Sequence, residues 1–204
     1  TSSIFLHIIK VYLHYRLTKR KIWRRIIHEV RNMAITTKSQ ILKVLKAFNP
    51  WWATGSVHPD FTKDYRRFAY YEAMKRIDQT DLRRTVVLTG TRRVGKTTIQ
   101  YQMIDTLLKR KIPPQRIVFI SLDHPMLKLS NFNDILECYH ENICPDQNVF
   151  YFFDEIQYVA DWDKWLKTIN DMQPETCMIA TGSASPALMK GSTESGAGRW
   201  SIIP

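Results

Sequence analysis

Eight consecutive residues carry the clearest chemistry in this sequence. Residues 90–97 read GTRRVGKT and match the pattern G-x-x-x-x-G-K-[ST] without a mismatch. In such a loop Gly90 permits a sharp turn, and Gly95 lets the backbone approach an anion closely. The N–H groups at the start of a following helix then bind phosphate oxygens, where the helix dipole also favours negative charge. Lys96 would reach the β- and γ-phosphates, and the Thr97 hydroxyl would bind Mg²⁺.

The pattern therefore predicts a phosphate-binding loop that holds ATP and Mg²⁺. An ordinary basic turn is the alternative, but the motif follows a β-branched run and precedes a helical pattern, which is the context that the motif requires. The charges of Arg92 and Arg93 either strengthen phosphate binding or lie in solvent. The expected nucleotide contacts are Gly90, Arg93, Val94, Gly95, Lys96, Thr97 and Thr98.

Two adjacent carboxylates, Asp154 and Glu155, end an apolar run at residues 148–155. Parallel sheets bind ligands at the carboxyl ends of their strands. Asp154 is therefore expected to hold Mg²⁺, directly or through water, and Glu155 to orient and polarise an attacking water. The alternative is that either acid merely caps the next turn. The order of the motifs and the Asp-Glu pair favour ATPases with a catalytic glutamate over kinases or Ras-like GTPases.

Hydroxyls and an arginine follow further along the chain. Thr181 or Ser183 would hydrogen-bond the attacking water or the γ-phosphate, unless the segment is a simple strand-end turn. Arg199 precedes the last apolar run and would stabilise charge on the γ-phosphate, in its own subunit or in a neighbouring copy of a homo-oligomer. A surface arginine is the alternative. We expect Glu155, Ser183 and Arg199 to be the catalytic residues.

Alternating strands and helices must position these side chains. Such alternation is typical of an α/β fold with a parallel sheet of about five strands and helices on both faces. The run at 148–155 is nearly all apolar, as expected of a strand buried on both faces. Strands are expected at 84–90, 116–123, 148–155, 177–183 and 199–204, and helices at 96–111, 131–142, 161–171 and 185–191, with Asn131 or Asn133 capping the second of these helices.

Three domains are expected: a basic helical extension at 1–32, helices and a linker at 33–82, and the core at 83–204. In the middle part, helices are predicted at 38–48 and 64–77. The turn after the first of these helices carries Trp51 and Trp52. Because adjacent residues on a regular element face different ways, we expect these two to anchor the linker to the core rather than to stack on a ligand.

Residues 1–32 contain eight Lys or Arg against one acid, a net +7 of the chain's +11. Three interpretations remain open. The segment is a helix that packs on its own protein or on a protein partner, a membrane-surface or nucleic-acid arm, or sequence that is not native, in which case Met33 is the true start. Any nucleic-acid or membrane contact is expected only through this segment. Both ends of the chain look like cut edges of a longer protein.

Three cysteines without metal-ligand spacing favour reduced thiols in a cytoplasmic protein. No apolar run reaches the length of roughly 18 residues that spans a bilayer. The composition, 44% hydrophobic and 24% charged, is that of a globular protein.

Together, GTRRVGKTT, SLDHP, YFFDEIQYVADWDKWLK, ATGSAS and ESGAGRW resemble blocks of the prokaryotic AAA-superfamily ATP-binding proteins, and NPWW resembles their lead-in. The match runs from about residue 40 to Pro204. Thr91 stands where that family often has proline, and residues 1–32 have no counterpart.

The resemblance implies a AAA-type ATPase core. It assigns Gly90, Gly95, Lys96 and Thr97 to ATP, Asp154 to Mg²⁺, Glu155 to water activation, and Ser183 and Arg199 to γ-phosphate sensing. Members of that family continue into a C-terminal domain that this sequence does not include. The implied function is ATP hydrolysis that drives a conformational change in that domain. The alternative is an ATP-operated regulatory switch or binding module with little turnover.

Overall fold

The computed structural model describes residues 36–79, 85–145, 148–183 and 200–204. Within the chain, Thr37–Pro204 form one compact unit. The expected extension at 1–32, the expected short helix at 185–191 and Arg199 all lie outside the described residues.

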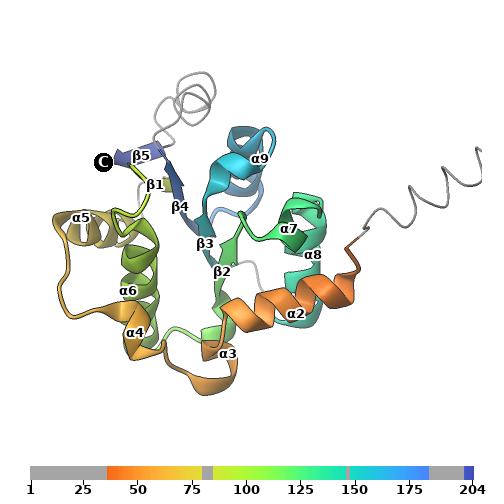
Figure 1. Cartoon of the computed structure of the whole chain (residues 1–204), viewed down its shortest axis with the longest axis horizontal. Coiled ribbons are helices and arrows are strands. Elements are labelled where there is room, and N and C mark those ends of the chain that lie inside the picture. Colours follow the sequence, from red (N-terminus) through yellow and green to blue (C-terminus); the bar gives the residue numbers. More distant parts are fainter. Residues whose placement is uncertain (1–35, 80–84, 146–147, 184–199) are drawn as a thin grey trace, which may run out of the picture. The chain divides into compact units, whose positions relative to one another are not determined.

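Five parallel strands form one sheet in the order β2-β3-β4-β1-β5 (Figure 1). The strands are β1 (Thr85–Gly90), β2 (Ile117–Ser121), β3 (Phe150–Asp154), β4 (Cys177–Ser183) and β5 (Trp200–Ile203). Register aligns their carboxyl ends, because Gly90 pairs with Ser183 and Ser121 pairs with Asp154. The predicted α/β fold of the P-loop NTPase type is confirmed, and β4 lies between the strand before the phosphate loop and the strand that ends in the carboxylates.

Helices cover both faces of the sheet because successive strand residues point to opposite sides. Phe153 faces a core shared with α2 (Lys38–Phe48), α8 (Phe132–Asn142) and α9 (Trp162–Met172). Its neighbour Phe152 faces the other core, with α5 (Phe68–Ile77) and α6 (Lys96–Lys109). Both phenylalanines are fully buried, as the apolar run at 148–155 predicts.

Local capping sets where the helices begin. The Thr37 side chain and Gln40 form a reciprocal capping box at the start of α2. Asn131 caps α8 by accepting a 2.8 Å hydrogen bond from the Asn133 N–H, so the first of the two predicted caps is confirmed. Short helical turns that the sequence did not predict are α3 (Trp51–Thr54), α4 (Pro59–Thr62), η1 (Pro114–Arg116), α7 (Pro125–Lys128) and η2 (Ile156–Tyr158).

The outer edge of β2 is closed by side chains from the NPWW segment. The buried Asn49 amide accepts from Phe119 N–H at 2.6 Å and donates to Phe119 O at 2.8 Å, as a neighbouring strand would. The indole N–H groups of Trp51 and Trp52 both donate to Ile117 O, at 3.0 and 2.9 Å. The predicted anchor is therefore present, although the two indoles converge on one carbonyl instead of separating. The contacts satisfy backbone groups that an edge strand otherwise leaves exposed.

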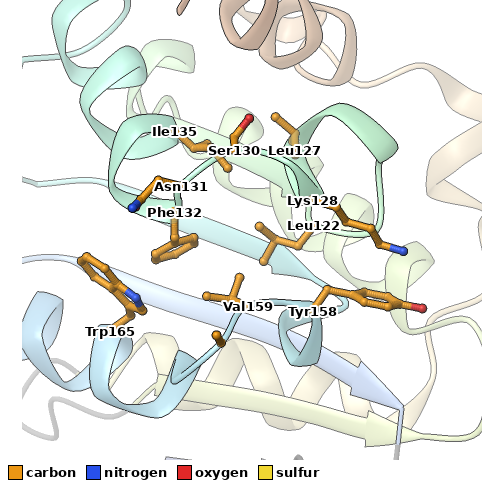
Figure 2. Close-up of a pocket in the computed structure, with 11 residues that line it drawn as sticks. Leu122, Leu127, Lys128, Ser130, Asn131, Phe132, Ile135, Tyr158, Val159 and Trp165 are labelled. Atoms are coloured by element: carbon orange, nitrogen blue, oxygen red, sulfur yellow. The ribbon is translucent and has the colours of Figure 1, made fainter. Parts of the chain in front are cut away.

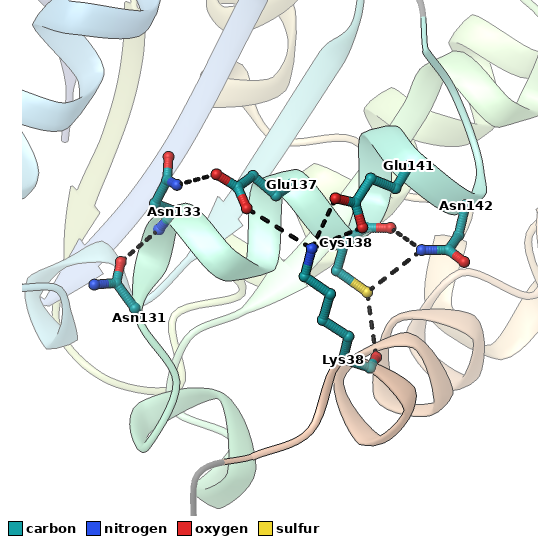
Figure 3. Close-up of polar contacts among 7 residues, drawn as sticks. All are labelled: Lys38, Asn131, Asn133, Glu137, Cys138, Glu141 and Asn142. Atoms are coloured by element: carbon teal, nitrogen blue, oxygen red, sulfur yellow. Dashed lines mark hydrogen bonds and ion pairs between the residues drawn. The ribbon is translucent and has the colours of Figure 1, made fainter.

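A polar cluster ties α2 to α8 (Figure 3). The Lys38 ammonium lies 2.7 Å from Glu141 Oε1 and 3.8 Å from Glu137 Oε2, and the Cys138 thiol donates to Lys38 O at 3.3 Å. The ion pairs are half exposed, so each contributes little to stability. Among the described residues, no helix has the length and apolar character needed to cross a membrane.

Candidate functional site

The phosphate loop, residues 90–97, connects the end of β1 to the start of α6 and needs glycine at two positions. Gly95 has φ +92° and ψ +21°, a left-handed conformation that L side chains rarely adopt. Gly90 has φ +152°, and a Cβ there would lie 3.2 Å from Val94 Cγ2. Arg93 is also left-handed, at φ +65°. The conformation therefore explains both glycines of the motif.

Helix α6 begins at Lys96, and its first intrahelical bond runs from Ile99 N–H to Gly95 O. The earlier N–H groups of the helix have no intrahelical partner, which leaves them for an anion at the helix N-terminus. Lys96 is buried, with 7% of its surface exposed, and its ammonium donates to Gly90 O and Thr91 O, both at 3.0 Å. The Lys96 ammonium is thus held by two carbonyl oxygens of the loop itself.

Thr97 and Asp154 meet across 57 positions of sequence. The Thr97 hydroxyl lies 3.1 and 3.0 Å from the two carboxylate oxygens of Asp154. Asp154 Oδ1 also accepts a 2.5 Å hydrogen bond from the Thr181 hydroxyl, which in turn accepts from Glu155 N–H at 3.0 Å. Thr181 is fully buried. The Thr181 hydroxyl therefore already bonds both Asp154 and Glu155. Ser183 is only partly buried, so its hydroxyl is the more accessible of the two.

Burial raises the pKa of Asp154 above its ordinary value, while the hydrogen bonds from Thr181 and Thr97 act in the opposite direction. The nearby carboxylates of Glu155 and Asp123 raise the pKa further. A buried carboxylate with an elevated pKa is stabilised in its charged form by a cation. A hydroxyl and a carboxylate are also the hard oxygen donors that Mg²⁺ prefers, with phosphate oxygens and water completing its coordination.

Glu155 follows Asp154 in a left-handed conformation, φ +55° and ψ +52°, and precedes η2. Its carboxylate oxygen Oε2 accepts a hydrogen bond from Gln157 Nε2, and the same amide donates to Ser183 Oγ at 3.1 Å. Asp154, Glu155, Gln157, Thr181 and Ser183 thus form one connected group, here called the β3–β4 rim. The sequence did not single out Gln157, because its partner Ser183 is 26 residues away.

Arg92 and Arg93 are both exposed. The Arg92 guanidinium donates to the Tyr158 hydroxyl at 3.3 Å, and the Lys128 ammonium lies 3.7 Å from the centre of the Tyr158 ring. Tyr158 is therefore held between two cations. Arg199 lies outside the described residues, so its predicted role stays a prediction.

Arg67 is a second residue that the sequence did not single out. Its guanidinium donates to Val94 O, and a Cβ at Gly95 would lie 3.6 Å from Arg67 Cζ. A cavity of about 330 Å³ lies beside the loop, between Arg67, Val94 and Ile203. No motif spacing links Arg67 to residues 27 positions later, so only the folded chain brings this arginine to the loop.

A groove of about 300 Å³ lies beside Tyr158, the last residue of η2. Figure 2 shows Tyr158 and Val159 on one wall, with Leu122, Leu127, Lys128 and Phe132 on the other. Among the described residues, no group of three or more His, Cys, Asp or Glu side chains could hold a metal ion. The Thr97–Asp154 pair is a different kind of site, since it would share its cation with bound phosphate.

The profile of a family described as an AAA domain matches residues 82–204. The uncharacterized protein MJ1637 of Methanocaldococcus jannaschii is 31% identical over 132 residues, 61% of this chain and 27% of that protein. The uncharacterized protein MJ1544 of the same organism is 33% identical over 109 residues, 51% of this chain and 22% of that protein. The chain spans about a quarter of the length of these curated relatives. A solved structure of a DNA replication initiation factor is similar with a TM-score of 0.43 and 14% identity, over 72% of this chain and 47% of that one.

Proposed function

The chain belongs to the AAA-domain family and carries its ATP-binding P-loop core, and from this membership we propose that it hydrolyses Mg-ATP to drive a conformational change in a further domain. The observation that carries the proposal is the meeting of Thr97 and Asp154 beside the buried Lys96. These three side chains are the ones that phosphate and Mg²⁺ require in a P-loop ATPase.

ATP would enter with its phosphates over the N-terminus of α6. Lys96 would leave the carbonyl oxygens of Gly90 and Thr91 and donate to the β- and γ-phosphates, exchanging two neutral acceptors for charged ones. The Thr97 hydroxyl and the Asp154 carboxylate would hold Mg²⁺, which supplies charge neutralisation at the phosphate oxygens. The backbone N–H groups around residues 93–98 would bind the remaining phosphate oxygens.

Glu155 is the proposed base. Its carboxylate would take a proton from water as the water oxygen forms a bond to the γ-phosphorus. The bond from that phosphorus to the β–γ bridging oxygen breaks, which releases ADP and phosphate. Ser183 would contact the attacking water or the γ-phosphate, and Arg199 would stabilise the charge that develops there, in its own subunit or in a neighbouring one.

The wider assignments are part of the same proposal. Hydrolysis would drive the movement of a further domain or of a protein partner, in a homo-oligomer if Arg199 acts on a neighbouring copy. Nucleic acid or a membrane surface would be contacted only through residues 1–32. The cytoplasm is the proposed compartment.

The test is Glu155→Gln in the full-length protein, with ATP binding measured by calorimetry and turnover by phosphate release. We expect ATP affinity to stay within about threefold of wild type and turnover to fall by about 10²–10⁴-fold, the usual contribution of a general base. Glu175→Gln is the control, since Glu175 is an exposed acid outside the rim.

Unchanged hydrolysis by Glu155→Gln would remove Glu155 as the base. If wild type binds ATP but turns it over no faster than Glu155→Gln, the protein is an ATP-operated switch instead.

A further inference from the structure

We propose that Gln157 is a positioning residue for hydrolysis, which orients the Glu155 carboxylate and couples it to Ser183. The inference rests on the proposed function, because it assigns a partner to the base of that reaction. The starting observation is that one side-chain amide bonds two groups expected to surround the attacking water.

The two N–H bonds of the Gln157 amide are both used. One donates to Glu155 Oε2 and the other to Ser183 Oγ, at 3.1 Å for the second. Glu155 follows β3, whereas Ser183 is the last residue of β4. The amide therefore links the ends of two neighbouring strands. Of the two carboxylate oxygens of Glu155, it bonds Oε2 and not Oε1.

The backbone that carries Gln157 is held on several sides. Ile156 is fully buried, and Tyr158 N–H donates to Glu155 O at 3.1 Å within the η2 turn. The Tyr158 side chain lies between Arg92 and Lys128, and Figure 2 shows Tyr158 beside Lys128. Because both neighbours of Gln157 are restrained, its amide can fix the position of a carboxylate that would otherwise rotate freely.

The carbonyl oxygen of the Gln157 amide gives a second, independent observation. Oε1 is buried, and no described protein group donates a hydrogen bond to it. Buried side-chain acceptors are rarely left without a donor. The two bonds that the amide does make are therefore both donated by its nitrogen, to the proposed base and to Ser183, and they hold these two groups in one arrangement.

The test is Gln157→Leu in the full-length protein, compared with Gln157→Glu. Leucine fills similar space but donates no hydrogen bond, and we expect kcat to fall by about 10–100-fold, as for other groups that orient a working residue. KM and ATP affinity should stay within about twofold, since Gln157 is not among the expected nucleotide contacts. Gln157→Glu keeps the shape but sets a second carboxylate against Glu155, so kcat should fall at least as far.

A purely structural role is separated by a double-mutant cycle. In a Glu155→Gln background, single-turnover assays with radiolabelled ATP should show less than about a threefold further loss on adding Gln157→Leu, because the residue acts through Glu155. Gln173→Leu is the matched control, a partly buried glutamine on a different turn, and should leave kcat unchanged. If Gln157→Leu does not fold, the shorter Gln157→Asn, which cannot reach both acceptors, takes its place in the cycle.

The inference is overturned if kcat is unchanged in Gln157→Leu, or if the loss persists in full in the Glu155→Gln background. Either result leaves the proposed function intact as long as Glu155→Gln alone abolishes turnover. Hydrolysis by Glu155→Gln at the wild-type rate is a separate outcome, which removes Glu155 as the base, and the lack of ATP hydrolysis by the wild-type protein is the outcome that overturns the proposed function itself.

Discussion

The phosphate loop and the β3–β4 rim lie at the same edge of the sheet, but they are held together in different ways. The loop closes on itself, since Lys96 bonds carbonyl groups five and six residues earlier in the chain. In the rim only the bond from Gln157 to Glu155 is local. Thr181 and Ser183 reach Asp154 and Gln157 across 27 and 26 residues.

The difference teaches which parts of the site depend on the sheet. Two glycines with positive φ and the start of α6 shape the loop, so its conformation is set mainly within a short segment, to which Arg67 adds one bond at Val94 O. The rim exists only while β3 and β4 keep their register, in which Phe153 pairs with Ala180. Damage to the sheet should therefore disturb the proposed catalytic base before it disturbs phosphate binding.

The largest expected effect is on the loop. Lys96→Ala removes an ammonium that would donate to two charged phosphate groups, and hydrogen bonds to charged groups contribute about 1.5–3 kcal/mol each. We expect ATP affinity to fall by about 100-fold or more, measured by calorimetry in the presence of Mg²⁺. The rim should remain folded, because no rim residue bonds Lys96.

Lys109→Ala is the matched control for that substitution. Lys109 ends the same helix and pairs with Asp105 on the surface, so its loss should leave ATP affinity within about twofold. Intact affinity in Lys96→Ala would remove the loop from nucleotide binding and reverse the comparison.

The next effect is on the rim. Thr181→Val keeps the shape of a fully buried side chain but removes a hydroxyl that donates to Asp154 and accepts from Glu155 N–H. We expect the free energy of unfolding to fall by about 2–3 kcal/mol, since a partly buried N–H and a buried carboxylate each lose a partner. Urea denaturation measures the change.

Thr168→Val controls for the loss of a hydroxyl from a surface helix, where Thr168 donates to Lys164 O. Its effect should stay below about 1 kcal/mol. Equal losses of unfolding free energy in the two variants would mean that the Thr181 hydroxyl stabilises the protein no more than a surface hydroxyl does. The register of β3 and β4 would then be maintained by their apolar residues alone.

The contrast between local contacts in the loop and long-range contacts in the rim also explains what the sequence could predict. Lys96 and Thr97 follow from spacing within one motif, and the alternation of apolar runs with helical patterns predicted all five strands of the sheet, which the structure confirms. Gln157 and Arg67 could not be found in this way. Gln157 bonds Ser183, 26 residues away, and Arg67 bonds Val94, 27 residues away. No periodicity in the sequence encodes such a pairing.

The NPWW segment was predicted only in part. Its two adjacent tryptophans predicted a hydrophobic anchor, because neighbouring residues on a regular element face different ways. Nothing in the sequence indicated that Asn49 would pair with Phe119 as a strand does, or that both indoles would bond Ile117 O. Those contacts depend on β2 being the outermost strand, which is a property of the whole topology.

The smallest expected effect concerns the surface link between the two regions. Arg92→Ala removes an exposed 3.3 Å hydrogen bond from the loop to Tyr158, next to Gln157. Exposed pairs contribute little, about 0–1 kcal/mol for ionic ones, so ATP affinity and kcat should each change by less than about threefold. Lys128→Ala, which removes the other cation beside the Tyr158 ring, should behave alike. A tenfold loss of kcat in Arg92→Ala alone, with affinity unchanged, would contradict this and would mean that the loop positions the rim from the solvent side. A small effect in both variants instead leaves the partly buried Thr97–Asp154 contact as the connection between the phosphate loop and the rim that carries the proposed base.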